Sequence, residues 1–441
     1  MDGSSAGPAG AVGLLRSAFA PGAPDSPQGP YLPLALLREI APVLHDEELD
    51  TRFLTGFADC QAVLSGPAFA VPDGDWLRRE RPEWAARPAA EFFYASLLGT
   101  NGAAHERLRA PLTAAFGPRR VAELSAGVEK TVEELLDRFA DATSDGGAAD
   151  FQEIVGYPLP VAVVGELIGV PRADRERFHR LGRDAARLLE PVRSDEDWHR
   201  ADAAVTVLRE YFAALLRERR ARPTGDLASA LLAQAGADRH PGVDRHPGAE
   251  SPPDGGRHRA GARQPLGEGE LADLLLLVFV AGFETTAGLL GTAVHTLLTH
   301  PGQAALLRAD PGLLPGAVEE VLRWDGPVLM TERLALRPVG VGGVTVPAGG
   351  SVTAVLGAAN RDPDRYPDPD AFLVHRTGVR VLSFGAGPHY CFGAALARLE
   401  GALLLGRLLE RFPRLAPAGE PVRRSSACLR SFDVLPLAAT G

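Results

Sequence analysis

The sequence predicts a mainly α-helical protein with small β-sheets. Apolar residues recur at spacings of three and four along five long segments, a pattern that indicates helices with one buried face. Strand-like patterns are few, and most of them lie in the last third of the chain. A content of 45% hydrophobic and 23% charged residues is typical of a folded protein with a substantial core.

The helical pattern covers residues 122–140, 203–221, 271–299, 315–324 and 394–412. Residues 271–281 are apolar on nearly every face, so this helix is expected to run through the centre of the protein. Residues 339–346 and 351–356 are rich in β-branched side chains and are predicted to form a hairpin around the turn 347–350.

The two ends of the domain and one internal segment have a different composition. Residues 1–28 are rich in Gly, Ala, Ser and Pro and are expected to form a flexible arm, which leaves 29–441 as a single domain. Residues 234–267 are polar and contain the repeat Asp-Arg-His-Pro-Gly at 238–242 and 244–248. The repeated histidines allow a metal-binding interpretation, but a flexible insertion between two helices is favoured because the segment has too few apolar residues to fold alone.

Charge and cysteine usage restrict the class of protein. The net charge of −10 and a pI near 5.6 argue against partners such as nucleic acid or anionic membrane. Cys60, Cys391 and Cys428 are far apart, so neither a disulfide framework nor a zinc site is suggested. No secretory signal is visible, and the apolar run 271–283, interrupted by Asp273, is expected to be too short for a bilayer, which needs ~20 residues. A cytoplasmic protein without membrane contact is expected.

The segment 384–393, Phe-Gly-Ala-Gly-Pro-His-Tyr-Cys-Phe-Gly, carries the strongest chemical signal. Its three glycines and Pro388 exclude regular structure and let the backbone approach a flat ligand closely. Cys391 stands where a helix begins, and the free N–H groups there favour the thiolate, which is the form that binds metals. The alternative is that Cys391 is a small buried apolar residue.

The pattern Phe-Gly-x-Gly-x-His-x-Cys-x-Gly near the C-terminus resembles the haem-binding loop of the cytochrome P-450 family, in its soluble, actinobacterial-like form. The resemblance implies the P-450 fold, with haem b (iron protoporphyrin IX) held between the central helix and this loop. Cys391 is then the metal ligand that donates electron density to iron. Phe384, Gly385 and Gly393 belong to the loop that holds the cofactor, and His389 contacts a haem propionate.

A second resemblance lies in the predicted central helix, where Ala281-Gly282-Phe283-Glu284-Thr285-Thr286 is similar to the family's oxygen-binding segment. The resemblance implies that Ala281 leaves room above the iron and that Glu284 and Thr285 are catalytic residues that supply protons to O₂. Reduction of O₂ consumes two protons, and a dry pocket needs a relay to deliver them. Taken alone, the motif also fits a helix kink with satisfied hydroxyl groups.

Further motifs resemble the family's haem-supporting scaffold. Glu320 and Arg323 are three residues apart and can pair on one helical face. The resemblance implies a structural network that Arg361 or Arg376 completes. His105, Arg109 and Arg333 match family positions that bind the haem propionates, whose burial requires cationic partners.

The resemblance implies a monooxygenase that uses O₂ to hydroxylate or epoxidise a hydrophobic small molecule, such as a natural-product biosynthetic intermediate. Because the chain lacks a nicotinamide-binding motif, a separate ferredoxin and ferredoxin reductase are expected to supply electrons. Arg107, Arg109 and Arg398 are candidate docking residues for an acidic partner.

The substrate pocket is expected to include Gly282, Val328, Leu329 and residues 92–98. Desaturation or carbon–carbon coupling is open to the same chemistry. Two other classes are alternatives: a non-catalytic P-450-like partner of a glycosyltransferase, which would lose the cysteine, and a haem sensor or carrier, which needs no proton relay.

Overall fold

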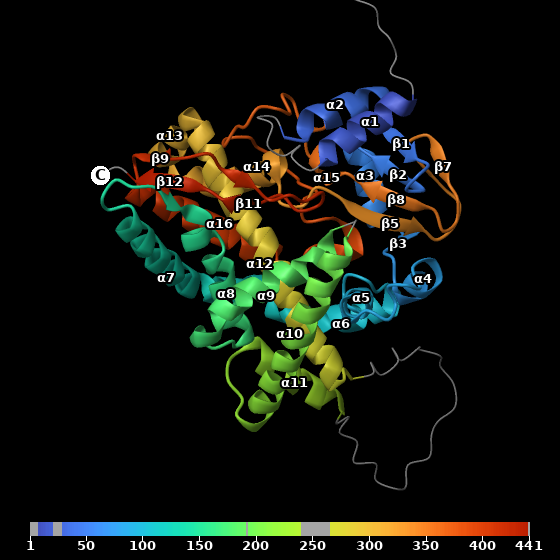
Figure 1. The fold of residues 1–441 in the computed structure, drawn as a ribbon, viewed down its shortest axis with the longest axis horizontal. Helices are drawn as coiled ribbons and strands as arrows, with labels where there is room; N and C mark the ends of the chain where they lie inside the picture. The colour runs from blue at the N-terminus through green and yellow to red at the C-terminus, as the bar shows by residue number, and fades with distance from the viewer. Residues whose placement is uncertain (1–7, 21–28, 191–192, 240–264, 440–441) are drawn as a thin grey trace, which may run out of the picture.

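The longest helix, α12 (Glu268–Thr299), passes through the middle of the molecule and organises the rest (Figure 1). The computed structural model describes residues 8–20, 29–190, 193–239 and 265–439. Helices α8, α9, α10, α14 and α16 all pack against α12. Its residues are apolar on every face because neighbours surround it.

The length of α12 overturns the expectation that this region is too short to cross a bilayer. The helix has 32 residues, and its apolar sequence continues well beyond Phe283. By length and composition it passes as a candidate membrane span, yet 83% of its most apolar window is buried within the protein. This burial is what a core helix shows.

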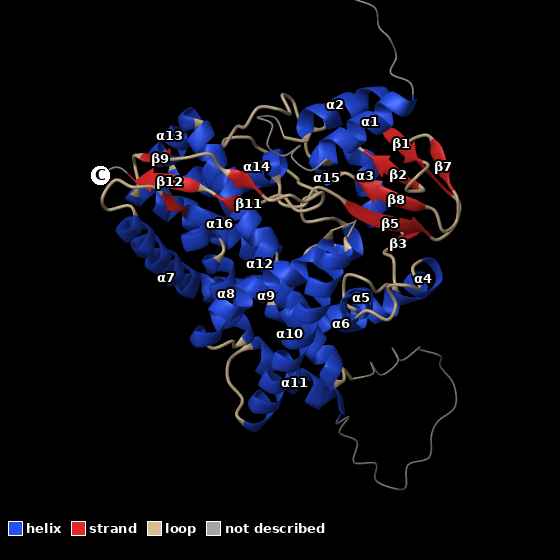
Figure 2. Cartoon of the chain, in the orientation of Figure 1, coloured by secondary structure: helices blue, strands red, loops and turns tan. Residues whose placement is uncertain are grey.

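Helices dominate the described chain (Figure 2). The α-helices are α1 (Pro8–Phe19), α2 (Tyr31–Ile40), α3 (Phe57–Ser65), α4 (Gly74–Glu80), α5 (Pro88–Ala95), α6 (Gly102–Ala115), α7 (Pro118–Ala142), α8 (Pro158–Ile168), α9 (Arg175–Ala185), α10 (Asp195–Ala221), α11 (Leu227–Arg239), α12, α13 (Pro301–Ala309), α14 (Leu314–Asp325), α15 (Leu356–Ala359) and α16 (Ala394–Arg411). All five helices predicted from the sequence are present, and α10 begins earlier than expected because Ser194 and Asp197 form a capping box at its start.

The strands form four small sheets. Their bounds are β1 (Val43–Asp46), β2 (Thr51–Leu54), β3 (Phe69–Ala70), β4 (Ala149–Asp150), β5 (Thr331–Ala335), β6 (Val339–Val341), β7 (Val344–Val346), β8 (Ser351–Ala354), β9 (Leu415–Pro417), β10 (Val422–Arg423), β11 (Phe432–Val434) and β12 (Pro436–Ala439). The largest sheet has the order β1-β2-β8-β5-β3, in which only β2 and β8 run parallel. The other sheets are β4-β12-β9, β6-β7 and β10-β11.

The predicted hairpin around 347–350 is wrong. The turn lies instead at Gly342 and Gly343, which join β6 to β7, and β8 pairs with β2 and β5. Both glycines have positive φ angles, 54° and 80°, as the tight two-residue turn between twisted strands requires. The sequence pattern did not separate this turn from the later Pro-Ala-Gly-Gly loop.

Two segments expected to be flexible are partly helical. Residues 8–19 of the predicted arm form α1, which packs on α2, and Ala11, Leu15 and Ala18 are buried between them and the large sheet. Residues 234–239 of the predicted insertion belong to α11, where Ala235 is buried. Residues 240–264, which carry the histidine repeat, lie outside the described residues.

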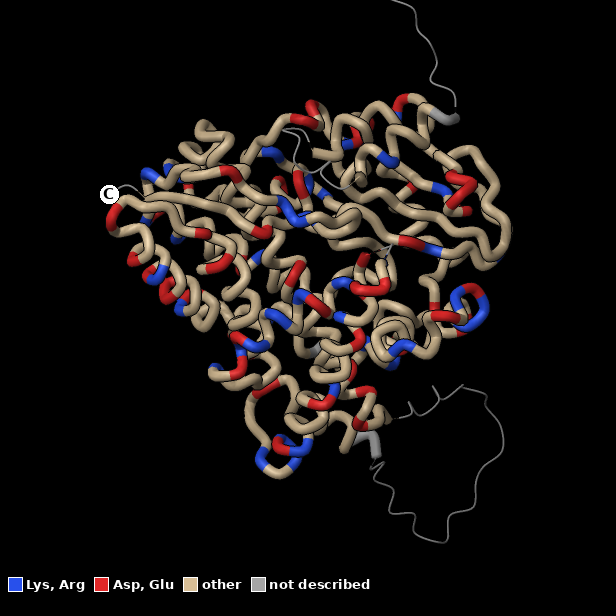
Figure 3. Tube along the Cα trace, viewed as in Figure 1, with Lys and Arg blue, Asp and Glu red and all other residues tan. Residues whose placement is uncertain are grey.

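Ion pairs fix α16, the helix that follows the cysteine loop, against α7. Arg411 pairs with Glu133 at 2.8 Å and with Asp137 at 2.6 Å, and Arg407 pairs with Glu129 and Glu133. Figure 3 shows the two signs of charge interspersed along α7. These contacts hold the C-terminal end of α16 against α7.

Candidate active site

A cavity of about 1540 Å³ lies between α12, the cysteine loop, β5 and the loop that joins β10 to β11. Cys391 lines one side and Thr285 lines another. Pockets for a single drug-sized ligand usually measure about 300–1000 Å³. The cavity therefore has room for a large flat cofactor together with a second molecule.

Backbone geometry shapes the cysteine loop. The Cys391 N–H donates to the Phe384 carbonyl at 2.9 Å, which closes the loop on itself. Gly385 and Gly387 both have φ of 69°, in the left-handed region. A Cβ atom at Gly387 would stand 2.6 Å from the Leu64 carbonyl oxygen, so no other residue fits there without a shift of backbone.

The Cys391 thiol is subject to opposing effects. Burial raises its pKa, whereas the backbone N–H groups of Gly393 and Ala394 and the charges of Arg109 and Arg398 lower it. The sulfur thus lies in an apolar site with hydrogen-bond donors at the start of α16. A thiolate bound to a metal cation is the form that this environment suits best.

Four cationic or basic side chains gather beside the loop: His105, Arg109, Arg333 and His389. The rings of His105 and His389 are 4.2 Å apart, and His105 Nε2 is buried without a hydrogen-bond partner among the described residues. Desolvation, followed by Arg333, His105 and Arg109, lowers the pKa of His389 to about 3.

No carboxylate of the described chain lies within ion-pair distance of these four groups. Arg333 is buried and donates only to Thr331 Oγ1 and its neighbour's carbonyl, and Arg109 donates to the Tyr390 carbonyl at 2.6 Å. Buried cations without anions are unfavourable. The cluster therefore fits a dianionic ligand, and the two propionates of haem have that charge.

On the other side of the cavity, the α12 motif is helical and continuous. The Thr285 hydroxyl donates to the Ala281 carbonyl at 2.8 Å, so its oxygen lone pairs remain able to accept a hydrogen bond in the cavity. Ala281 and Gly282 line the same wall. The hydroxyl of Thr285 is thus satisfied within the helix, as the structural alternative considered from the sequence also requires.

Glu284 is more enclosed than the sequence interpretation expected. Its side chain is 1% exposed and its Oε1 forms an ion pair with Arg424, while Oε2 has no hydrogen-bond partner in the described structure. Arg424 itself lines the cavity. Arg424 therefore lies between Glu284 Oε1 and the cavity, and Oε2 is the carboxylate oxygen that remains without a partner in the described structure.

The structure selects Arg376 rather than Arg361 as the third member of the Glu320–Arg323 network. Arg323 donates to both Glu320 oxygens at 2.7 and 2.8 Å, and Arg376 Nε donates to Glu320 at 3.1 Å. Arg361 instead stacks on Tyr31 and Trp324. The Glu320 and Arg323 side chains are fully buried. Together with Arg376 they hold the loop 367–373 through hydrogen bonds to four of its backbone carbonyls and one of its N–H groups.

Of the expected pocket residues, Val328 and Gly282 line the cavity and Leu329 does not. Leu329 is an interior residue whose side chain packs toward Gly357, because its backbone is hydrogen-bonded on both sides to Cys428 and Gly357. Within 92–98, Phe93, Tyr94, Leu97 and Leu98 line the cavity. Phe92 faces away and lies beneath Arg209.

Two of the three candidate docking arginines are already paired within the chain. Arg107 forms an ion pair with Glu270, and Arg398 forms one with Glu319 and lies over the Phe384 ring. Their charge is therefore partly neutralised.

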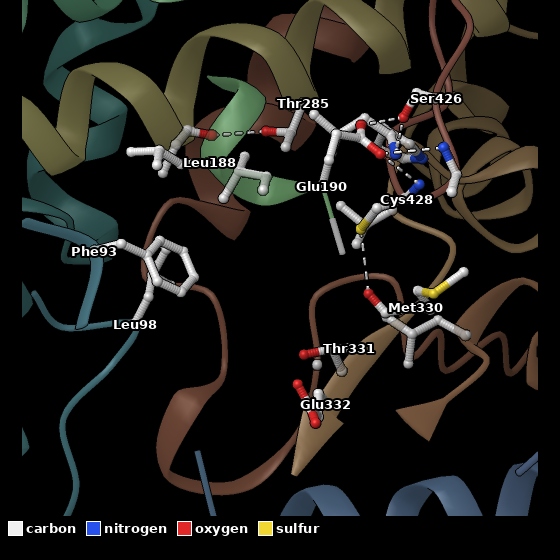
Figure 4. Close-up of a pocket in the computed structure, with 18 of the residues that line it drawn as sticks. Phe93, Leu98, Leu188, Glu190, Thr285, Met330, Thr331, Glu332, Ser426 and Cys428 are labelled. Carbon is white, nitrogen blue, oxygen red and sulfur yellow. Dashed lines mark hydrogen bonds between the residues drawn. The ribbon is translucent and has the colours of Figure 1, made fainter. Parts of the chain in front are cut away.

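Several cavity residues carry no sequence motif and were missed. Glu190, at the end of the 3₁₀ helix Ala186–Leu189, accepts hydrogen bonds from Ser426 Oγ and from the N–H groups of Ala427 and Cys428 (Figure 4). Glu332 on β5 and Glu400 on α16 also line the cavity. Tertiary packing alone brings these carboxylates together, and no local signal marks them.

Comparison with known proteins agrees with this geometry. A family model described as cytochrome P450 matches residues 307–427. The chain is 35% identical to 6-deoxyerythronolide B hydroxylase from Saccharopolyspora erythraea, over 93% of this chain and 96% of that protein. It is also 35% identical to the cytochrome P450 monooxygenase PikC from Streptomyces venezuelae, over 94% and 92%. The ligand-free structure of Mycobacterium smegmatis CYP164A2 superposes with a TM-score of 0.81 at 32% identity, covering 97% of this chain and 99% of that one.

Proposed function

Because this chain belongs to the cytochrome P450 family of haem-thiolate monooxygenases, we propose that it inserts one oxygen atom of O₂ into a hydrophobic natural-product intermediate, by hydroxylation or epoxidation. The observation that carries the proposal is one cavity with Cys391 on one wall and Thr285 on another, beside a cluster of basic groups that form no ion pair within the described residues. Relatives with 35% identity include one named a hydroxylase of 6-deoxyerythronolide B, which supports the substrate class.

Residues of this chain would hold the haem in two ways. Cys391 Sγ would ligate iron, supported by the N–H groups of Gly393 and Ala394. His105, Arg109, Arg333 and His389 would bind the propionates. When bound, the haem supplies the iron centre at which O₂ is activated.

Thr285 and Glu284 would handle protons. The Thr285 hydroxyl donates to the Ala281 carbonyl, which fixes its rotamer and presents its oxygen as an acceptor to a water molecule in the cavity. Glu284 Oε2 would hold the next proton, and Arg424 would control access to it because it covers Oε1.

Electrons would come from a separate ferredoxin and its reductase in the cytoplasm. Because Arg107 and Arg398 pair with internal glutamates, reversing either charge would also break an ion pair of the fold. The dependence of the reduction rate on ionic strength is a cleaner test, since docking of oppositely charged partners slows as salt increases.

The decisive experiment is the absorption spectrum of the reduced, CO-bound holoprotein. Wild type and Cys428→Ala are expected to show the strongly red-shifted Soret band of thiolate-ligated haem, and Cys391→Ala is expected to lose it. Cys428 is a matched control because it is also a cysteine of the cavity wall. A red-shifted band that persists in Cys391→Ala would refute the ligand assignment.

A further inference from the structure

Glu332 is a carboxylate of the cavity that forms no ion pair within the described part of the chain. It lies on β5, between Thr331 and Arg333, and Figure 4 shows it across the cavity from Phe93 and Leu98. Ser351 Oγ donates to Glu332 Oε1 at 2.5 Å. Thr51 Oγ1, on the neighbouring strand β2, lies 2.6 Å from Ser351 Oγ. Within the described residues, no arginine, lysine or histidine stands within 4.0 Å of this carboxylate.

The three nearest arginines are engaged elsewhere. Arg193 donates to the carbonyls of Arg187 and Leu188 and lies over the Trp198 ring. Arg81 lies over Trp84, 5.6 Å from the ring centroid. Arg333 belongs to the basic cluster that a dianionic ligand would neutralise. Burial raises the pKa of Glu332, and the hydrogen bond from Ser351 together with the more distant charges of these arginines offsets this only in part.

Two aromatic residues, Tyr94 and Trp76, line the same cavity as Glu332. Tyr94 is buried on the cavity wall, and its hydroxyl makes no hydrogen bond within the described chain. Burial raises the pKa of Tyr94, the charge of Arg193 lowers it, and the charge of Glu332 raises it. The Trp76 ring stands 5.7 Å from the Tyr94 ring, and Trp76 also lines the cavity. A carboxylate beside aromatic faces is a favourable site for an organic cation.

We propose that Glu332, in the cavity that Tyr94 and Trp76 also line, forms a subsite for a positively charged group of the substrate, so that the preferred substrates are apolar molecules that carry a basic nitrogen. This inference rests on the proposed function, which it makes more specific. The cation would supply the counter-ion that Glu332 lacks, and the apolar body of the molecule would extend along Phe93, Leu98 and Leu188 toward Thr285.

The test compares three probes of equal chain length on the holoprotein: octyltrimethylammonium, octanol and octanoate. The quaternary nitrogen has no lone pair, so it cannot ligate the haem iron. Dissociation constants are measured by calorimetry. Wild type is expected to bind the cation at least about tenfold more tightly than octanoate. The expected factor follows from buried charge pairs in general, in which loss of one partner weakens binding by that factor or more. Glu332→Gln, which keeps the shape and the Ser351 contact, is expected to abolish that preference and change octanol binding by less than about twofold.

Glu190→Gln is the matched control, because Glu190 lines the same cavity but its oxygens are already occupied by three donors of the chain. An equal loss of cation binding in both variants would mean that any carboxylate of the cavity attracts the cation through its charge. That result would overturn a specific subsite at Glu332. Unchanged cation binding in Glu332→Gln, or tighter binding of octanoate than of the cation by wild type, would overturn it as well. The CO-bound spectrum of each variant reports separately on the haem-thiolate assignment, so a failure of the subsite is distinguishable from a failure of the proposed function.

Discussion

At the residue scale, the site depends on side chains whose charge is not balanced by the protein itself. Burial opposes the ionised form of several of them: Cys391, His105, Arg333, His389, Glu332 and Glu400. Such groups reduce the stability of the empty fold and favour the binding of a complementary ligand. This loss of stability arises in the cavity, where the chemistry is proposed to occur.

Replacement of Thr285 tests the proton relay. Thr285→Ala is expected to retain the CO-bound band but to divert several-fold more of the consumed electrons into hydrogen peroxide, because the hydroxyl that orders water is lost. Peroxide and product are measured per electron donor consumed. Thr285→Ser, which keeps the hydroxyl, is expected to stay close to wild type; equal uncoupling in the two variants would exclude the hydroxyl as the cause.

Glu400 provides a pH-dependent test of a buried carboxyl group. Burial raises its pKa from 4.5 to about 8, and its Oε2 has no partner among the described residues. Below pH 4.5 both the folded and the unfolded chain carry the proton, whereas between 4.5 and about 8 only the folded chain does, so this group lowers stability as pH rises.

Glu400→Gln removes this titration. The free energy of unfolding of the variant, relative to wild type, is expected to increase by up to roughly 4 kcal/mol between pH 5 and pH 8, at ~1.4 kcal/mol per pKa unit. Urea unfolding of both proteins at the two pH values measures it. A constant difference between the two pH values would show that the carboxyl is not protonated in the fold.

At the element scale, the loop 384–393 links two helical layers through its glycines. Its closure at the Phe384 carbonyl aims Cys391 toward α12, and the ion pairs between α7 and α16 fix the helix that begins beside it. The large sheet contributes Arg333 from β5, so the basic cluster joins three separate elements. The loop therefore presents Cys391 to the cavity only when α7, α16 and β5 are folded around it.

Gly387→Ala is expected to be the most damaging single-methyl change in this loop. It combines a left-handed φ with a contact of 2.6 Å to the Leu64 carbonyl, so we expect a loss of about 2–4 kcal/mol and weaker haem retention. Gly378→Ala is the control, because Gly378 has φ of 67° but nothing lies within 4 Å of the added methyl. Thermal unfolding and haem content of the two variants are compared. Equal effects would show that backbone strain alone, and not the contact, decides the outcome.

At the scale of the whole molecule, Asp325 joins the N-terminal and C-terminal parts of the chain. It ends α14, accepts a hydrogen bond from Tyr31 at 2.7 Å and forms ion pairs with Arg423 and Arg430. Burial alone would raise the pKa of Asp325, but Arg430, Arg423 and Tyr31 hold it well below its usual range. This stabilising contribution is present above the unfolded pKa of about 3.9 and is lost as pH falls below it.

Asp325→Asn is expected to reduce the free energy of unfolding by about 3–5 kcal/mol at neutral pH, because it leaves two buried arginines without their anion. The difference from wild type is expected to shrink as the pH is lowered from 6 to 3. Asp364→Asn, at an exposed position, is expected to change stability by less than about 0.5 kcal/mol. A difference from wild type that is independent of pH would show that Asp325 is not ionised in the fold.

The sequence by itself determined the helical class, the five long helices, the family and the identity of the cysteine that is proposed to bind iron. These properties depend on local patterns, because the period of apolar residues and the glycines around Cys391 are constraints within one segment. The hairpin was misplaced since two glycine-rich turns lay within eight residues of each other, and α1 was missed because its stability comes from packing on α2 and the sheet.

Only the tertiary structure decided which groups meet in the cavity. It selected Arg376 over Arg361, removed Leu329 from the wall, covered Glu284 with Arg424 and brought Glu190 and Glu332 into one space. Each outcome joins residues separated by dozens to hundreds of positions, and the direction of a side chain over such a distance depends on the packing of whole elements. Charge balance in a cavity is therefore a property of the fold, which no single segment of the chain contains.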